Sequence, residues 1–148
     1  MPVDNCMVML KPVKISRHFS VSAERVFDAW LNPAVIKLWM FKSAVNEIVN
    51  VKIQRWVGGR FSILEQSEDG EIDHFGEYKE ITGPRRLGFS LEVPHHFPGV
   101  TVVDIQIDPD INGCNLTLTQ TGVPAKITEG SWTEMLHNLE LLLSKKSQ

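Results

Sequence analysis

Apolar residues near the end of the chain recur at spacings of three and four. They are Trp132, Met135, Leu136, Leu139, Leu142 and Leu143. This spacing predicts a helix over 130–143 with one buried face, and Ser131 and Glu134 predict a capping box at its start. Full burial of each such side chain stabilises a fold by about 1.5–3 kcal/mol, so the helix requires a broad apolar partner surface.

Alternation of apolar and polar residues predicts strands before this helix. Val13, Ile15 and Phe19 alternate with polar neighbours, which indicates a half-buried strand over 13–19. Six further strands are separated by short turns rich in glycine, proline, asparagine or aspartate, and are expected at 44–56, 60–66, 71–81, 87–93, 100–107 and 114–121. Connections this short predict antiparallel neighbours.

Two short helices are expected between the first and second strands. Ser22 is a typical N-cap, and the apolar spacing after it predicts a helix over 22–31. Asn32 and Pro33 predict the start of a second helix that ends at Trp39, because proline at the first helical position loses no hydrogen bond. The order strand, two helices, six strands and helix is typical of an α+β domain.

Turn residues set the strand register in two hairpins. A three-residue loop over 57–59, with glycine in a left-handed position, pairs Ile53 with Ile63. This register keeps the apolar residues of both strands on one face. We expect that face to look toward the C-terminal helix.

A polar pair is expected on the same face. The turn dipeptide at 69–70 favours a two-residue turn, which places Glu65 opposite His74, with Tyr78 and Arg55 nearby. Burial of such a pair opposes the charged imidazole, whereas the carboxylate favours it. The pair is therefore a candidate for holding the polar group of a ligand or for transferring a proton, and an ordinary cross-strand ion pair is the alternative.

Several motifs occur in an order that resembles a known family. They are Val26-Phe-Asp-Ala-Trp-Leu-Asn-Pro33, Trp39, Gly58-Gly-Arg-Phe61, Gly76-Glu-Tyr-Lys-Glu-Ile-x-x-Pro-x-Arg-Leu-Gly-Phe89, Leu116-Thr-Leu-Thr119 and Trp132-x-x-x-Leu136-x-x-Leu139. The order resembles the domain related to the C-terminal domain of activators of the heat-shock-protein-90 ATPase (AHSA-type), within the START-like (SRPBCC) helix-grip superfamily. The resemblance runs from about Ile15 to Leu143. It implies a curved antiparallel sheet of six to seven strands wrapped around the long C-terminal helix, with an internal cavity.

A chain of 148 residues with 43% hydrophobic residues suits one domain with one core. We assign 13–146 to a single START-like domain and 1–12 to an N-terminal extension. The candidate cavity residues combine the inner sheet face with the helix stripe, and are Trp39, Arg55, Phe61, Ile63, Glu65, His74, Tyr78, Phe89, Trp132, Met135, Leu136 and Leu139. A filled core fits the apolar members of this set equally well.

Composition limits the kinds of partner that we expect. The net charge is −3 with both signs scattered, and the basic pairs at 85–86 and 145–146 are short, so no nucleic acid partner is expected. The N-terminal 10 residues do not resemble a signal peptide, and no apolar run reaches membrane-spanning length, so no membrane partner is expected. Cys6 and Cys114 are too few for a disulfide framework, which indicates a cytoplasmic protein.

No metal or cofactor site is predicted. His95 and His96 are adjacent and lack further spaced ligands, and Cys114 has no evident base beside it. Arg17 shares the parity of the apolar residues in the first strand, either as a charge that snorkels at the end of the sheet or as an anion anchor in the cavity. Trp56 is expected to point outward, where it is a candidate for a homodimer contact.

Three functional hypotheses follow. The leading one is a non-enzymatic module that binds a small apolar or amphipathic molecule between the sheet and the last helix. The second is a polyketide cyclase-like enzyme, in which Glu65, His74 and Tyr78 position and protonate a substrate. The third is a chaperone activator, against which we note that eukaryotic activators carry an additional N-terminal domain that 148 residues do not accommodate.

Overall fold

The computed structural model describes residues 11–146, so residues 1–10 of the expected N-terminal extension lie outside the described part. The order of elements is the predicted one. The strands are β1 (Val13–Phe19), β2 (Glu47–Ile53), β3 (Arg60–Ser67), β4 (Gly70–Thr82), β5 (Arg86–Leu91), β6 (Thr101–Asp110) and β7 (Gly113–Thr121). The helices are α2 (Ala23–Ala29), α3 (Pro33–Trp39) and α4 (Ala125–Lys146).

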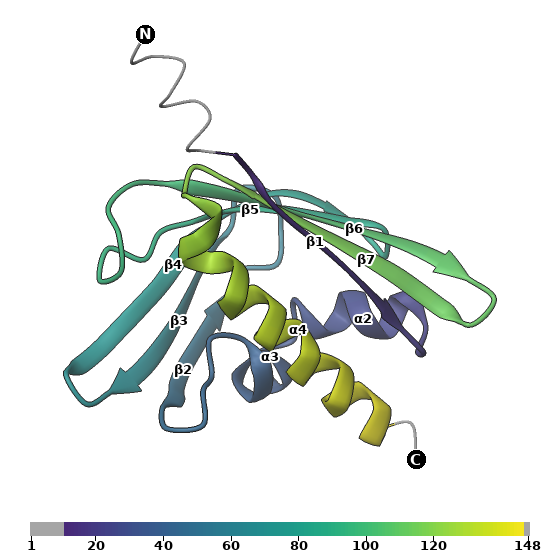
Figure 1. The fold of residues 1–148 in the computed structure, drawn as a ribbon, viewed down its shortest axis with the longest axis horizontal. Coiled ribbons are helices and arrows are strands. Elements are labelled where there is room, and N and C mark those ends of the chain that lie inside the picture. The colour runs from purple at the N-terminus through teal and green to yellow at the C-terminus, as the bar shows by residue number, and fades with distance from the viewer. Residues whose placement is uncertain (1–10, 147–148) are drawn as a thin grey trace, which may run out of the picture.

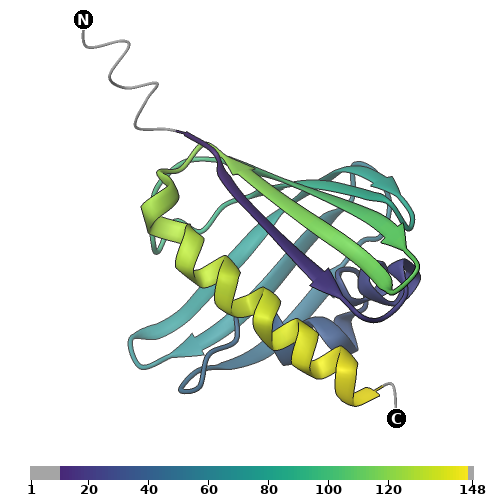
Figure 2. The same ribbon diagram turned by 45° about the vertical axis from the view of Figure 1, so that its right-hand side comes forward.

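The strands form one antiparallel sheet in the order β1-β7-β6-β5-β4-β3-β2. The sheet curves, and α4 runs along its concave side with β1 and β7 on one flank and β2, β3 and β4 on the other (Figures 1 and 2). Helices α2 and α3 lie near the C-terminal end of α4 (Figure 1). The predicted α+β helix-grip architecture is confirmed.

Burial follows the predicted period of two. In β6, Thr101, Val103, Ile105 and Ile107 are buried and alternate with exposed residues. One side of β6 therefore faces the core, while the other faces solvent, whereas in β5 all residues from Leu87 to Leu91 are buried. No helix within residues 11–146 is both long and apolar enough to cross a membrane.

The two short helices begin where residue types predict. The Ser22 side chain accepts a hydrogen bond from the Arg25 backbone N–H at 3.2 Å, and the Asn32 side chain accepts one from the Ala34 N–H at 3.0 Å. Pro33 is the first residue of α3. These caps satisfy backbone donors that a helix start leaves unpaired.

Helix α4 begins earlier than its apolar stripe predicts. Its first residue is Ala125, so Ser131 lies inside the helix and the predicted capping box is wrong. The stripe from Trp132 to Leu143 packs into the core, whereas Ile127 and Ser131 in the first turns are exposed. The first turns therefore carry no buried stripe from which a sequence pattern would reveal them.

The β2–β3 register is shifted by two residues from the predicted one, since Ile53 pairs with Phe61. The glycine loop does not close this hairpin alone. The Gly58 N–H donates to the Tyr78 carbonyl at 2.8 Å, and the Tyr78 N–H donates to the Gly59 carbonyl at 2.9 Å, so the loop also pairs with β4. Because a shift of two preserves side-chain direction, the apolar residues still face inward except Val49, which is exposed at an irregularity in the strand pairing.

The β3–β4 register also differs by two residues. The turn lies at 68–69, and Glu65 is opposite Ile72 and not His74. The Ser67 hydroxyl accepts a hydrogen bond from the Asp69 N–H at 3.2 Å and donates one to the Gly70 carbonyl at 2.8 Å. Both bonds favour the earlier turn. Glu65 and His74 become diagonal neighbours on the inner face.

Candidate ligand-binding pocket

A pocket of about 380 Å³ lies between the first half of α4 and the sheet. It is lined by Phe41, Lys42, Ser43, Glu65, His74, Leu91, Val93, His96, Phe97, Gln120, Ile127, Thr128, Ser131, Trp132, Glu134 and Met135. His96, Ser131 and Glu134 are exposed, so the pocket reaches the surface. Its walls combine aromatic and aliphatic groups with a few polar ones, as small-molecule sites do.

A buried polar pair lies in this pocket. The Nε2 atom of His74 is 2.9 Å from Oε1 of Glu65, and the two side chains are 4% and 9% exposed. The Asn46 side-chain amide donates a hydrogen bond to the other Glu65 oxygen. The His74 ring stacks on Phe41 with ring centroids 3.9 Å apart and an interplanar angle of 12°. Two strands and the loop after α3 therefore fix the pair.

Burial determines the protonation of His74. Desolvation lowers the pKa of His74 below its ordinary value of 6.5, although the hydrogen bond to Glu65 acts in the opposite direction. The neutral ring donates its Nε2 proton to the carboxylate, which leaves Nδ1 as an acceptor. Nδ1 is buried and has no hydrogen-bond partner among residues 11–146. Buried polar atoms without a partner are uncommon, and Nε1 of Trp30 is the other one among the described residues.

Phe41 shapes the wall beside the pair with an unusual backbone conformation. Its φ is 61°, in the left-handed region that non-glycine residues enter at a cost of about 1–3 kcal/mol. The Phe41 N–H points at Sδ of Met135 at 3.0 Å, and its ring lies 5.9 Å from that of Trp132. These contacts, together with the stack on His74, offset the backbone strain.

Gln120 connects the sheet to the first half of α4. Its Oε1 accepts hydrogen bonds from Trp132 Nε1 at 2.9 Å and from the Thr128 hydroxyl at 2.8 Å, and its Nε2 donates to the Thr101 hydroxyl at 3.0 Å. Three partners inside the protein therefore hold this side chain. Gln120 positions Trp132 and α4 at the pocket.

The family model described as "Activator of Hsp90 ATPase homolog 1-like protein" matches residues 20–144. The chain belongs to this family. Its fold is the helix-grip fold of the START-like superfamily. No curated protein matches the chain.

Solved structures share the family fold at low sequence identity. A crystal structure of a protein from Chromobacterium violaceum is 22% identical with a TM-score of 0.80, covering 88% of this chain and 95% of that one. The solution NMR structure of an AHSA1-like protein from Aeromonas hydrophila is 23% identical with a TM-score of 0.79, covering 93% and 94%. A protein from Nitrosomonas europaea is 21% identical with a TM-score of 0.78, covering 94% and 97%. Structures at this level of sequence identity show the fold of the chain and nothing further.

Four of the predicted cavity residues line the pocket of this family member. They are Glu65, His74, Trp132 and Met135. Four others surround a space of only about 10 Å³ together with a residue of α3 and the residues that directly follow α2 and α3, and are Phe61, Ile63, Tyr78 and Phe89. That part of the expected cavity is filled core.

The remaining predicted cavity residues lie elsewhere. Leu136 and Leu139 are buried in the core. Trp39 is also buried, and its Nε1 donates to the Ala29 carbonyl at 3.1 Å. Arg55 is exposed, so its expected position on the inner face is wrong, because the strand ends at Ile53. A ligand-binding role for any of these residues stays a prediction.

Sequence reasoning missed most of the pocket wall. Phe41 and Lys42 lie in the loop after α3, and His96 lies in the loop after β5. Irregular segments carry no periodicity from which a facing direction follows. Gln120 could have been identified from the sequence, because it shares the parity of Leu118, which is buried in β7.

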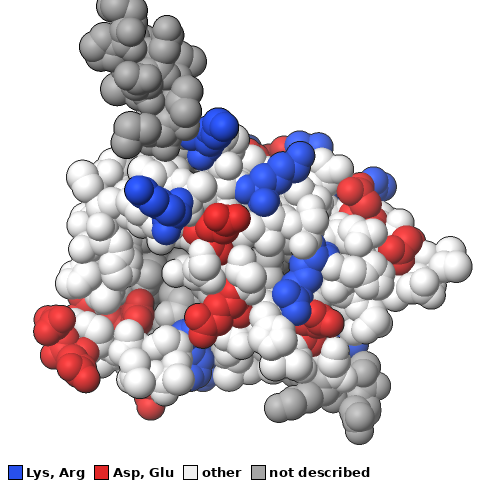
Figure 3. Space-filling view, viewed as in Figure 1, with Lys and Arg blue, Asp and Glu red and all other residues white. Residues whose placement is uncertain are grey.

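Arg17 neither snorkels freely nor lines the pocket. Its Nε donates to Oε1 of Glu140 at 2.7 Å, and a terminal nitrogen lies 2.9 Å from Nδ1 of His137. Both partners belong to α4, so Arg17 ties the edge strand β1 to the helix. Around α4, Lys and Arg are interspersed with Asp and Glu on the visible face (Figure 3).

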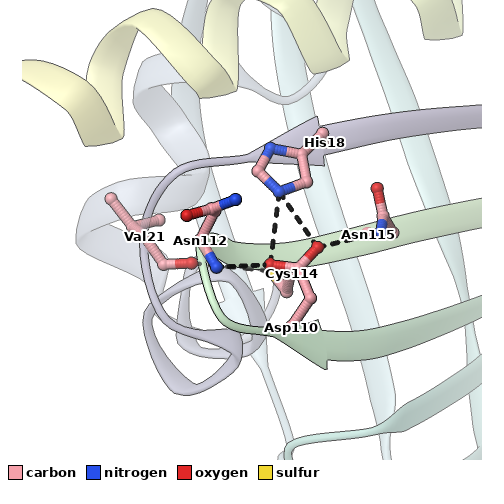
Figure 4. A network of polar contacts seen from close by, with 6 residues as sticks. All are labelled: His18, Val21, Asp110, Asn112, Cys114 and Asn115. Carbon is pink, nitrogen blue, oxygen red and sulfur yellow. Dashed lines mark hydrogen bonds and ion pairs between the residues drawn. The ribbon is translucent and has the colours of Figure 1, made fainter.

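A second polar cluster lies at the end of β1. Nε2 of His18 is 3.1 Å from Oδ2 of Asp110, and Asn112 and Asn115 also donate to that carboxylate (Figure 4). The buried Cys114 lies beside it, with Sγ 3.6 Å from the Val21 carbonyl. Among the described residues, no group of three or more His, Cys, Asp or Glu is arranged to hold a metal ion.

Proposed function

We propose that the protein binds a small amphipathic molecule in the pocket under α4. The observation that carries the proposal is an open space of about 380 Å³ with a buried carboxylate–imidazole pair in its wall. This volume falls in the range of roughly 300–1,000 Å³ that is typical of small-molecule sites. Trp132, Met135 and Leu91 offer apolar surface for the body of the ligand, and Glu65 and His74 offer contacts for its polar end.

A fluorescent ligand tests this proposal. N-phenyl-1-naphthylamine is uncharged and is expected to bind with increased fluorescence. Ser131→Trp places a large side chain at the pocket and is expected to raise the dissociation constant at least about tenfold, or about 1.4 kcal/mol. Thr133→Trp is the matched control, because Thr133 is exposed on the same helix and does not line the pocket.

The outcome separates a pocket from general surface binding. Equal affinity in both tryptophan variants, or no binding to the unchanged protein, contradicts the proposal. Native mass spectrometry of the purified protein adds an independent measurement. We expect a bound molecule that Ser131→Trp removes and Thr133→Trp retains.

A second candidate function is acid–base catalysis in the same pocket. The supporting observation is the 2.9 Å contact of His74 with Glu65 in a pocket that reaches solvent. In this reading the pair removes a carbon-bound proton from a substrate and returns a proton to it. The test is deuterium exchange at the carbon between the two carbonyl groups of nonane-2,4-dione, followed by NMR. Exchange that Glu65→Gln does not slow contradicts this candidate.

We also propose a cytoplasmic location. The buried Cys114 is a free thiol, which suits a reducing compartment. Fractionation of cells that produce the tagged protein tests this. Recovery outside the cytoplasmic fraction contradicts the proposal.

A further inference from the structure

The Glu65 carboxylate is buried without a cationic partner. Its partners among residues 11–146 are the imidazole of His74 and the amide of Asn46. Both are neutral groups, because burial lowers the pKa of His74. Buried charges in proteins are ordinarily paired, since desolvation of an isolated charge is costly. The pocket therefore contains a negative charge that lacks its counter-ion.

The one cationic side chain that lines the described pocket does not fill this role. Lys42 directs its ammonium group to the Ser43 carbonyl at 3.4 Å. Glu134 adds a second carboxylate at the pocket from α4. With histidines counted as neutral, the lining carries two carboxylates and one ammonium, so its net charge is negative.

The free hydrogen-bonding capacity beside Glu65 consists of acceptors. Each Glu65 oxygen accepts one hydrogen bond and retains a further lone pair, and Nδ1 of His74 has no partner. The polar atoms of Gln120 are already bonded to Trp132, Thr128 and Thr101. A ligand that satisfies this wall has to bring donors.

From this geometry, and resting on the function proposed above, we infer that the pocket selects an amphiphile whose polar end is a hydrogen-bond-donating cation, such as a primary ammonium, paired with Glu65. The ammonium supplies the missing counter-ion and the missing donors together. A carboxylate ligand of the same length brings a second negative charge beside Glu65 and is rejected, because like charges repel strongly in a buried site.

Three ligands of one chain length test the inference. Octylammonium, octanol and octanoate are titrated into the full-length protein at pH 7 by calorimetry. Octylammonium is expected to bind at least about tenfold more tightly than octanoate, with octanol between them. This ratio is measured on the unchanged protein, so it does not depend on the folding of any variant.

Charge variants then locate the preference. Glu65→Gln keeps the shape of the side chain and is expected to weaken octylammonium at least about tenfold without weakening octanoate. Glu129→Gln is the control, because Glu129 is exposed on the same helix and does not line the pocket, and is expected to change octylammonium binding less than about threefold. Lys42→Gln removes a competing cation and is expected to tighten octylammonium.

Several results overturn the inference. Equal affinities for octanoate and octylammonium overturn it. So does a ratio of these two affinities that Glu65→Gln leaves unchanged in a folded variant. If octanol and octanoate bind, are blocked by Ser131→Trp, and outcompete octylammonium, the proposed binding function stands and the cation preference is wrong. If none of the three binds, the cation preference is wrong, and the binding function stands or falls with N-phenyl-1-naphthylamine.

Discussion

Two histidine–carboxylate pairs occupy opposite environments in this molecule. Glu65 and His74 lie 2.9 Å apart with 9% and 4% of their side chains exposed. His18 and Asp110 lie 3.1 Å apart with 42% and 36% exposed. The chemical groups and the distances are alike, so burial accounts for the difference between the two pairs.

Burial changes how well each carboxylate is satisfied. Asp110 receives hydrogen bonds from the Asn112 N–H at 2.8 Å, the Asn115 amide at 3.1 Å and His18, with solvent available around it (Figure 4). In the buried pair, the side chains are largely shielded from solvent and Nδ1 of His74 has no partner in the described chain. The exposed pair joins two parts of the sheet, whereas the buried pair has unused capacity for a ligand.

The largest expected contrast comes from removing each histidine. His74→Ala is expected to lower the free energy of unfolding by about 3–5 kcal/mol, because it leaves the Asn46 amide as the one described partner of the buried Glu65 carboxylate and removes the stack on Phe41. His18→Ala is expected to cost less than about 1 kcal/mol, because the pair is exposed. Urea unfolding followed by circular dichroism measures both, and equal losses contradict the comparison.

The next largest effect is expected from acid, which destabilises the fold through His74. The pKa of His74 is lowered below 6.5 by burial in the folded state, whereas the unfolded chain has the ordinary value. Below about pH 6.5 the unfolded state binds the extra proton, so stability falls as pH falls, by up to about 1.4 kcal/mol per unit. The loss continues until pH passes the lowered pKa of the folded state.

The slope of stability against pH, and not the absolute stability, shows whether His74 causes this pH dependence. His74→Gln is expected to flatten the loss between pH 7 and pH 5.5, and His18→Gln is expected to retain it. The charged and titratable groups near His74 are the same in both variants and include Glu65, Asp73, His96, Lys42 and Glu134. An identical slope in both variants contradicts the assignment to His74.

Neutralising each carboxylate is expected to have effects of opposite sign. Glu65→Gln removes an uncompensated buried charge and, because the Asn46 amide can turn to accept from the introduced amide, is expected to stabilise the fold by about 1 kcal/mol. Asp110→Asn exchanges one acceptor for a donor and is expected to destabilise it by less than about 1 kcal/mol. Thermal unfolding measures both. Destabilisation by Glu65→Gln contradicts the uncompensated charge and with it the reason for a cationic ligand.

The starts of the two short helices were predicted correctly from local residue types, whereas the strand registers were not. The caps Ser22 and Asn32 follow from residue type, because a side chain that bonds a nearby N–H needs no distant partner. Both hairpin registers were missed by two residues. The bonds of Ser67 around its turn and of Gly58 to Tyr78 were competing contacts that turn dipeptides do not reveal.

One part of the candidate site was predictable and the remainder was not. Glu65 and His74 were placed inward by parity, which a two-residue shift preserves. Phe41 and His96 approach them from irregular segments, whose course depends on the packed structure. The separation between pocket and filled core also depends on packing, because Phe61 has the same inward parity as Glu65 but meets α3 and its neighbours.

The smallest expected effect concerns Cys114, which lies beside the exposed pair (Figure 4). Burial raises the pKa of this thiol to about 11, so in a Cys6→Ser background it is expected to react with a chromogenic disulfide reagent only when the sheet end opens. His18→Ala loosens the link between β1 and Asp110 and is expected to raise the labelling rate about two- to fivefold, as a loss below about 1 kcal/mol allows. Glu65→Gln is the control and is expected to leave the rate unchanged, because the buried pair lies in a different part of the sheet. A rate that responds to Glu65→Gln and not to His18→Ala shows that the two pairs do not act independently.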